Sequence, residues 1–378
     1  MLWLQVANIL LHISQQLNYN IINMKALYAY FGEIGIFDDD IPGHSFYQVG
    51  LLDSISKVFG IDKFDFYNYL DGPADMTTGD TSQYHRPKFP EGQIGQLMNN
   101  YSNELIEKYR LSYDQVWAEI SHKTYSKLFF KARFRNLSTL SKKLKDTYRF
   151  ETLIQHALSV GYLPSEIIVL DTDLSLSDTF KNRLDEIGIE VMIPSIHFPG
   201  VSKNFLNECL DIHANQLTKE ANIIFYGNLD FMNYKSGHHK NPIIFDIINE
   251  VEHQFMFDQR IFRMTLATKD TSSIRECTKG MNLVTVIPRT DRAKIWQHLC
   301  NSIVSINVSK DLYLDRGFIP ARIYESIIAG VIPVCYKSGF HPAMTFNSVD
   351  EFYEICKFLI DCSPADYQKI LYSIASTL

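Results

Sequence analysis

Short apolar runs alternate with longer amphipathic segments over most of this chain. The short runs predict buried strands, and the amphipathic segments predict helices that cover those strands. The predicted strands are residues 26–31, 64–70, 167–170, 189–193, 223–226, 263–267, 284–287, 303–308 and 331–336. The predicted helices are residues 45–59, a helical stretch over 94–160, residues 179–187, 243–255 and 292–300, a segment around residue 322, and two closing helices after Ser348 and Ser363.

Two successive series of strand and helix predict an α/β protein with two Rossmann-like domains that face each other across a cleft. The predicted boundaries are residues 1–23 for an N-terminal extension, 24–205 for the first domain and 206–378 for the second. Residues 71–93 are rich in Gly, Pro, Asp and Thr, which predicts a long loop.

Length and composition agree with this division. A chain of 378 residues that is 46% hydrophobic and 21% charged is too long for one core. The net charge of -7 gives no general attraction to nucleic acid, so such a partner would need a local basic patch. Six cysteines without metal-type spacing favour a reducing cytoplasm and predict no metal site. Residues 1–17 are too short and interrupted to span a bilayer, so we expect no membrane partner.

Arg322 and Glu325 lie three positions apart at the start of a predicted helix, just before a buried strand. This spacing places both side chains on one helical face. A helix N-terminus and a guanidinium can hold a diphosphate, and a carboxylate can accept hydrogen bonds from the hydroxyls of a ribose. The pattern therefore indicates a nucleotide site, although an ordinary charged pair on a solvated helix face has the same spacing.

A second candidate segment, residues 225–240, follows a predicted strand and contains two glycines and a basic cluster. Glycines allow close backbone approach to a phosphate, and the basic side chains supply charge, so the segment is a phosphate-loop candidate. An exposed loop would have the same composition. The candidate binding residues here are Tyr226, Gly227, Asn228, Lys235 and His238.

Asp171 and Asp173 follow the end of a predicted buried strand, where α/β proteins often hold functional acids. Either carboxylate could act as a general base. A strand-end aspartate that caps the next helix is the structural alternative. The Asp-x-Asp pattern also resembles the metal signature of another glycosyltransferase fold and the nucleophile strand of haloacid-dehalogenase-type phosphatases, but the companion motifs are absent from the sequence.

Residues 121–150 form a basic stretch in an otherwise acidic protein, with aromatic residues among the cations. Phosphate backbones bind such surfaces, whereas a solvated helix face is the structural alternative. The candidate DNA contacts are Lys123, Lys127, Lys131, Arg133, Arg135, Lys142, Lys143, Lys145 and Arg149.

Taken in order, the Thr172-Asp173 strand end, the Tyr226-Gly227 loop and the Arg322-Glu325 helix resemble the DNA glycosyltransferases of T-even-like bacteriophages. The beta-glucosyltransferase and the arabinosyltransferases are the members in question. The resemblance covers roughly residues 165–360 and implies the GT-B fold. It also implies inverting transfer of glucose or arabinose from a UDP-sugar to 5-hydroxymethylcytosine in double-stranded DNA.

The resemblance further implies roles for individual residues. Arg322 would hold the diphosphate and Glu325 the ribose, while Ile287 and Pro288 would lie against uracil. Asp173 would be the catalytic base. The resemblance also implies a monomer in the cytoplasm of an infected bacterial cell. A divalent cation is compatible with departure of the diphosphate, but no residue pattern requires one.

Two other functions remain open from sequence alone. One is a GT-B glycosyltransferase acting on a surface glycan or a small-molecule acceptor, and the other is a non-catalytic nucleic-acid-binding protein. The basic stretch favours the DNA enzyme over the glycan enzyme, which would not need it.

Overall fold

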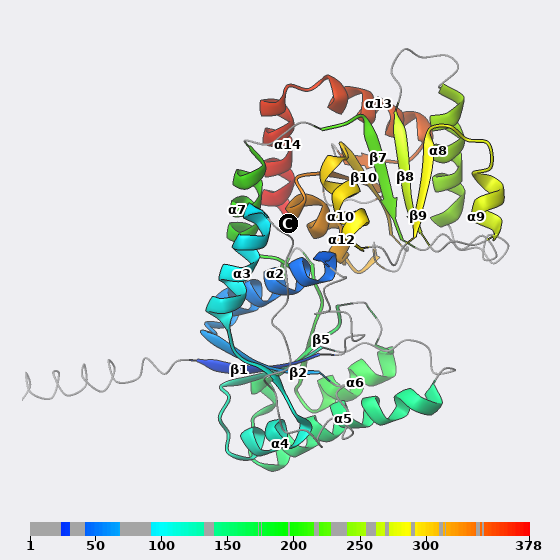
Figure 1. The fold of residues 1–378 in the computed structure, drawn as a ribbon. Coiled ribbons are helices and arrows are strands. Elements are labelled where there is room, and N and C mark those ends of the chain that lie inside the picture. The colour runs from blue at the N-terminus through cyan, green and yellow to red at the C-terminus, as the bar shows by residue number, and fades with distance from the viewer. Residues whose placement is uncertain are drawn as a thin grey trace, which may run out of the picture.

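The computed structural model describes two parallel β-sheets, each sandwiched between helices (Figure 1). The described residues are 24–30, 42–68, 92–131, 140–172, 174, 176–195, 197–214, 219–227, 240–254, 262–268, 272–288, 292–309, 313, 315–337, 341 and 344–378.

The first sheet has the strand order β3-β2-β1-β4-β5-β6. Its strands are β1 (Lys25–Tyr30), β2 (Lys63–Asn68), β3 (Ile106–Leu111), β4 (Lys127–Lys131), β5 (Ile167–Leu170) and β6 (Glu190–Met192). The connecting helices are α2 (Pro42–Phe59), α3 (Gln93–Leu105), α4 (Tyr113–Ser121), α5 (Leu140–Ser159), the short 3-10 turn η5 (Pro164–Glu166) and α6 (Asp178–Glu186).

The second sheet has the order β12-β11-β10-β7-β8-β9. Its strands are β7 (Asn222–Tyr226), β8 (Arg263–Thr268), β9 (Val284–Pro288), β10 (Val304–Val308), β11 (Ile332–Tyr336) and β12 (Thr345–Phe346). Its helices are α7 (Lys203–Ala214), α8 (Lys240–Gln254), α9 (Ser272–Cys277), α10 (Arg292–Asn301), α12 (Ala321–Ile328), α13 (Val349–Asp361) and α14 (Pro364–Thr377).

Both sheets have the doubly wound Rossmann order, because the second one also reads 3-2-1-4-5-6 when its strands are numbered from β7. The strand order reverses between β1 and β4 in the first sheet and between β7 and β10 in the second. Ligands of open α/β sheets bind outside the carboxyl ends of the strands at such a reversal. In the second sheet, the topology therefore predicts a ligand site at the carboxyl ends of β7 and β10.

Strand residues alternate between two apolar layers, as the two-residue period of a strand requires. In β1, Tyr28 belongs to the layer beneath α2 and α3, whereas Leu27 and Ala29 belong to the layer beneath α4, α5 and α6. The layer around Tyr28 continues through α7, α12 and α14 into the core of the second domain. One apolar core therefore joins the two domains.

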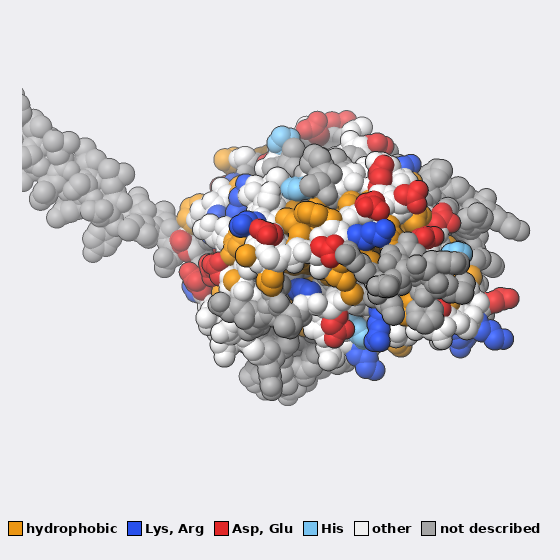
Figure 2. Space-filling view, turned by 90° about the horizontal axis from the view of Figure 1, so that it is seen from above, with side chains coloured by type: hydrophobic (Ala, Val, Ile, Leu, Met, Phe, Trp, Pro, Cys, Tyr) orange, Lys and Arg blue, Asp and Glu red, His pale blue; other side chains and the backbone are white. Residues whose placement is uncertain are grey.

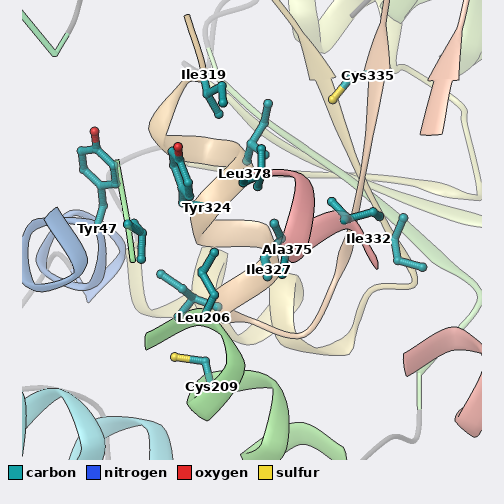
Figure 3. Close-up of a cluster of buried hydrophobic side chains, with 14 of the residues drawn as sticks. Tyr47, Leu206, Cys209, Ile319, Tyr324, Ile327, Ile332, Cys335, Ala375 and Leu378 are labelled. Atoms are coloured by element: carbon teal, nitrogen blue, oxygen red, sulfur yellow. The ribbon is translucent and has the colours of Figure 1, made fainter. Parts of the chain in front are cut away.

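At this junction α12 lies among helices from both halves of the chain (Figure 3). Tyr47 of α2 lies beside Tyr324 of α12, with ring centroids 5.9 Å apart. Leu206 and Cys209 of α7 face the same cluster from the other side. Helix α14 packs along α7, so the end of the chain closes the junction (Figure 1).

The sequence-based prediction of a helical stretch over residues 94–160 is wrong. The structure has strands β3 and β4 inside this stretch, and β4 is central to the first sheet. Helix α3 ends at Leu105 and β3 begins at Ile106, so no glycine or proline separates the two elements. In β4 only Leu128 to Phe130 are buried between two lysines, a run too short to reveal its period.

The other predicted elements agree with the structure to within a few residues, although helices α7 and α9 and the short strand β12 were not predicted. Residues 1–23 and nearly all of the predicted loop at 71–93 lie outside the described residues. The domain boundaries stay a prediction, with β1 to β6 in the first sheet and β7 to β12 in the second.

Candidate functional site

The candidate site lies where β7 ends and α12 begins. Pro320 is the N-cap residue of α12 and has extended backbone angles, which suits the residue that precedes a first turn. Because proline has no polar side chain, no capping side chain satisfies the first amide groups of the helix. The helix ends at Ile328, and Gly330 follows two positions later with a φ of 68°, in the left-handed region that favours glycine.

Arg322 and Glu325 both converge on the end of β7. Arg322 Nη1 donates to the backbone carbonyl of Tyr226 at 2.8 Å. The Tyr226 hydroxyl lies 3.0 Å from Glu325 Oε2 and 3.0 Å from the carbonyl oxygen of Arg322. The residue pair that the sequence placed on one helical face is thus held against one strand end. The solvated-face alternative does not describe it, since Glu325 is only 6% exposed.

Burial keeps the Tyr226 phenol in its protonated form. Removal of Tyr226 from water raises the pKa of its phenol well above the ordinary value, and the neighbouring Glu325 raises it further. The phenol therefore stays protonated at neutral pH and can donate a hydrogen bond.

Gly227 allows the close approach of Arg322 to the strand end. A Cβ atom at Gly227 would lie 2.6 Å from Arg322 Nη1 and 3.3 Å from the Phe225 ring. A side chain at this position would collide with the guanidinium where it now lies. Gly227 thus leaves room for the Arg322 guanidinium. The sequence predicts a second role for Gly227, which is to let a phosphate approach the backbone closely.

The remaining predicted nucleotide contacts are only partly described. Asn228, Lys235 and His238 lie outside the described residues. The Ile287 side chain is buried in the apolar layer that also contains Tyr226, whereas Pro288, the last residue of β9, is exposed. Of the predicted pair, Pro288 is therefore the one that solvent reaches.

Asp171 lies at the carboxyl end of β5 and is fully buried. Its Oδ2 forms an ion pair with Lys181 Nζ of α6 at 3.2 Å and accepts a hydrogen bond from the Leu176 amide at 3.3 Å. The structural alternative, an aspartate that caps the next helix, does not describe these contacts, because Ser177 is the N-cap of α6 and Asp171 accepts an amide of the turn before it. Asp173 lies outside the described residues, and its catalytic role stays a prediction.

The carboxyl edge of the first sheet meets the start of α12. Ser195, just after β6, forms an isolated antiparallel bridge with Phe318. The Ile319 amide donates to the Pro194 carbonyl at 3.1 Å, and Arg316 pairs with Asp178 at the start of α6 at 3.0 Å. The strand end that carries Asp171 and the helix that carries Arg322 therefore face one junction.

The predicted basic stretch does not form one surface in the part of it that is described. Lys123 and Lys127 lie at the amino end of β4, where they donate to the carbonyls of Gly161 and Ser165 at 2.7 and 2.9 Å. Lys131 lies at the opposite, carboxyl end of the strand. Arg133 and Arg135 lie outside the described residues. The backbone of α5 places Lys142, Lys143, Lys145 and Arg149 on that helix.

Sequence reasoning missed the residues that anchor α12. The Tyr324 hydroxyl accepts the Gly200 amide at 2.9 Å, and His213 Nε2 lies 2.8 Å from the Ile328 carbonyl. Burial lowers the pKa of His213 to about 4. No local signal marks these residues, because their partners lie more than 100 positions away.

Within the described ranges, no set of His, Cys, Asp and Glu side chains gathers with metal-binding geometry. The helices of the same ranges include none with the length and apolar character needed to cross a bilayer. On the face drawn in Figure 2, the coloured acidic and basic side chains are mixed with apolar ones. The described side chains of this face do not form the uniform basic surface expected of a duplex-binding face.

Comparison with known proteins yields structural likeness alone. No protein-family model and no curated protein sequence matches the chain. An alpha-glucosyltransferase solved with UDP-glucose and DNA containing an abasic site matches with a TM-score of 0.51 and 10% identity, covering 93% of this chain and 94% of that one. The DNA-modifying enzyme beta-glucosyltransferase matches with a TM-score of 0.45 and 12% identity, over 93% and 94% of the two chains.

A third match is a UDP-N-acetylglucosamine 2-epimerase from Listeria monocytogenes, with a TM-score of 0.46 and 8% identity over 93% of this chain and 91% of that one. Identities this low speak only to the fold. The chain has the GT-B fold, with two Rossmann-like α/β domains, as the sequence predicts.

Proposed function

We propose that the protein is a glycosyltransferase that takes a sugar from a uridine diphosphate donor and transfers it to 5-hydroxymethylcytosine in double-stranded DNA. One observation carries the donor half of this proposal. Arg322 and Glu325 converge on Tyr226 and Gly227 at the strand-order reversal of the second sheet. This is the place where open α/β sheets bind nucleotides.

Each group at this place suits one part of a UDP-sugar. The uncapped start of α12 and the Arg322 guanidinium suit the diphosphate, and the Glu325 carboxylate suits the ribose hydroxyls. Pro288 suits the face of the uracil ring. Asn228, Lys235 and His238 complete the proposed phosphate loop, and glucose and arabinose are the proposed sugars. A divalent cation is compatible with this site.

The proposed reaction needs one base and one leaving group. Asp173 takes the proton of the hydroxymethyl group while that oxygen forms a bond to the anomeric carbon of the sugar. The bond from the same carbon to the diphosphate breaks, and UDP leaves with the negative charge stabilised by Arg322. The target base must leave the helical stack, because the hydroxymethyl group is out of reach inside the duplex.

The DNA acceptor is supported by the cations of the first domain and by one structural match that was solved with DNA. A surface glycan or small acceptor is the second candidate. The separation of Lys123 and Lys127 from Lys131 favours it, since a duplex needs a continuous basic surface. We further propose that the enzyme acts as a monomer in the cytoplasm of an infected bacterium.

The donor half is tested by calorimetric titration with UDP. Wild type should bind, and Arg322→Ala should bind at least about tenfold more weakly, because a charge-assisted contact to phosphate is lost. Arg183→Ala is the matched control, because Arg183 lies on α6 with its side chain 62% exposed. Equal UDP affinity in wild type and Arg322→Ala would contradict the proposed site.

The acceptor half is tested by incubating the protein with a panel of UDP-sugars and three acceptors: hydroxymethylated DNA, unmodified DNA and a mixed oligosaccharide set. Mass analysis of the nucleosides should find a glycosylated hydroxymethylcytosine only with the first acceptor. Transfer to oligosaccharides alone would replace the DNA proposal with the glycan one. UDP binding without transfer to any acceptor would leave only the donor half standing.

A further inference from the structure

The Tyr226 side chain does not fit the phosphate-lining role that the sequence predicts for it. It is buried, with 6% of its surface exposed, and its hydroxyl points to the carboxylate of Glu325. We propose that Tyr226 is a positioning residue that fixes the Glu325 carboxylate and thereby makes the site selective for ribose over 2′-deoxyribose. This inference rests on the proposed donor site and names what sets its specificity.

The Tyr226 hydroxyl donates its hydrogen bond to Glu325. The hydroxyl has one proton and lies 3.0 Å from both Glu325 Oε2 and the Arg322 carbonyl oxygen. A carboxylate is the stronger acceptor because it is charged, so the proton belongs on the side of Glu325. A carboxylate has about four lone-pair sites, more than one phenol can occupy. The single bond from Tyr226 therefore does not by itself prevent the carboxylate from accepting bonds from a ligand.

Tyr226 also holds Arg322. The Tyr226 carbonyl accepts Arg322 Nη1 at 2.8 Å, and the guanidinium carbon lies 6.0 Å from the centre of the Tyr226 ring. The backbone of one strand-end residue thus holds the cation while its side chain holds the carboxylate. The distance between the proposed diphosphate contact and the proposed ribose contact is set by a single residue.

The bond from Tyr226 also restricts the torsions of the Glu325 side chain. A glutamate has three side-chain torsions, and fixing them on ligand binding costs free energy that would weaken the bond to ribose. The phenol is held rigidly by Ile224, Ala267 and the other members of its apolar layer. A bond from a rigid donor orients Glu325 before the ligand arrives. The benefit appears only with ligands that present the ribose hydroxyls.

The test compares UDP with 2′-deoxy-UDP by calorimetry in wild type and in Tyr226→Phe, which removes the oxygen and keeps the ring. Wild type should prefer UDP. In Tyr226→Phe the affinity for UDP should fall about tenfold, the effect of losing one hydrogen bond to a charged group. The affinity for 2′-deoxy-UDP should change less than about twofold, so the preference largely disappears.

Tyr367→Phe is the matched control. The Tyr367 hydroxyl is also buried in the second domain and donates to the Ile303 carbonyl at 2.6 Å, at the amino ends of β10 and β11 rather than at the carboxyl strand end that carries Tyr226. Its loss should lower thermal stability and leave the preference for UDP unchanged. Site-specific 4-aminophenylalanine at position 226 restores a donor and should restore the preference, which gives a second measurement if Tyr226→Phe folds poorly.

The possible outcomes separate the two claims. If wild type binds no UDP, the proposed donor site fails and the inference fails with it. If wild type binds UDP and Tyr226→Phe keeps the full preference for ribose, the donor site stands and the positioning role of Tyr226 is overturned. Equal loss of affinity for both nucleotides would also overturn it, because it would indicate general damage to the site.

Discussion

The carboxyl ends of β5 and β7 lie at the carboxyl edges of two sheets with the same strand order. Each strand end has a buried carboxylate beside it, but the two carboxylates have different partners. At β5, Asp171 pairs with Lys181 of its own domain and accepts the amide of the following turn. At β7, the incoming carboxylate is Glu325 from a helix 99 positions away, and it is met by the phenol of Tyr226.

This difference separates structural acids from functional ones. An acid whose charge is balanced by a neighbouring lysine organises its own loop and has little left to offer a substrate. Glu325 instead accepts a hydrogen bond from a neutral phenol, beside Gly227 and the Arg322 guanidinium. We therefore propose a functional role for Glu325, a structural role for Asp171 and the base role for Asp173.

The largest expected effect is on the chemical step. Asp173→Asn should lower sugar transfer by about 10²- to 10⁴-fold, the range for loss of a general base. UDP affinity should not change, because the nucleotide contacts are in the other domain. Rapid-quench measurement of transfer, with calorimetry on the same sample, checks both statements. Full turnover in Asp173→Asn would show that another residue is the base, and it would contradict the division of roles between Asp171 and Asp173.

Asp171→Asn should instead act on folding. It leaves Lys181, whose side chain is 18% exposed, without its buried counter-charge, and we expect a loss of about 3 kcal/mol in the free energy of unfolding. Urea denaturation measures this loss. The control is Asp178→Asn, because Asp178 pairs with Arg316 at the surface and its side chain is 77% exposed. If Asp171→Asn keeps full stability and loses transfer activity, the two acids have been assigned the wrong way round.

Sequence reasoning succeeded where a feature is local and failed where it depends on distant partners. The spacing of Arg322 and Glu325 and the buried runs of β5 and β7 lie within a few residues, so their patterns could be read directly. The phenol that meets Glu325 is 99 positions away, and no pattern links the two. Strand β3 was missed because it follows α3 without a turn residue, and its pairing with β2 overrides local propensity.

The stability of the protein should also depend on pH through His213, which lies at the C-terminal end of α12. The expected loss is similar in size to that of Asp171→Asn. Unfolded His213 takes up a proton near its ordinary pKa of 6.5, whereas the buried side chain does so only near a pKa of about 4. Between these values the unfolded state binds more protons, so stability rises with pH and is lost as the pH falls. The two pKa values set an upper limit of roughly 3 kcal/mol for this loss.

Urea denaturation at pH 7 and pH 5 checks this expectation. His213→Asn should flatten the difference between the two pH values, whereas His122→Asn, at an exposed position, should preserve it. Lys219 also faces this helix end, donating to the Ala329 carbonyl at 3.4 Å, and it stays cationic throughout this range with a pKa lowered to about 8. An unchanged pH dependence in His213→Asn would contradict the assignment.

Gly227→Ala should weaken UDP binding about tenfold or more. The added Cβ would lie 2.6 Å from Arg322 Nη1, so the guanidinium must leave the Tyr226 carbonyl. Loss of a charge-assisted bond of this kind is worth about 1.5 kcal/mol or more. Gly60→Ala is the control, because its added Cβ meets open space although its φ of 66° makes it strained. Reduced stability with unchanged UDP affinity in Gly227→Ala would show that UDP binding does not need the bond from Arg322 to the Tyr226 carbonyl.

The smallest effect should come from Tyr324→Phe, which sharpens the contrast between the two tyrosines near α12. The Tyr324 hydroxyl accepts the Gly200 amide at 2.9 Å and faces the junction rather than the nucleotide side. Its removal leaves a buried amide without this acceptor and should cost about 1 kcal/mol of stability. UDP affinity should stay within about twofold of wild type, unlike the tenfold loss expected for Tyr226→Phe. If Tyr324→Phe weakened UDP binding as much as Tyr226→Phe, the position of α12 between the domains, and not the strand end alone, would control the donor site. The two domains would then have to be treated as one binding unit, because a contact made by the first domain would determine what the second one binds.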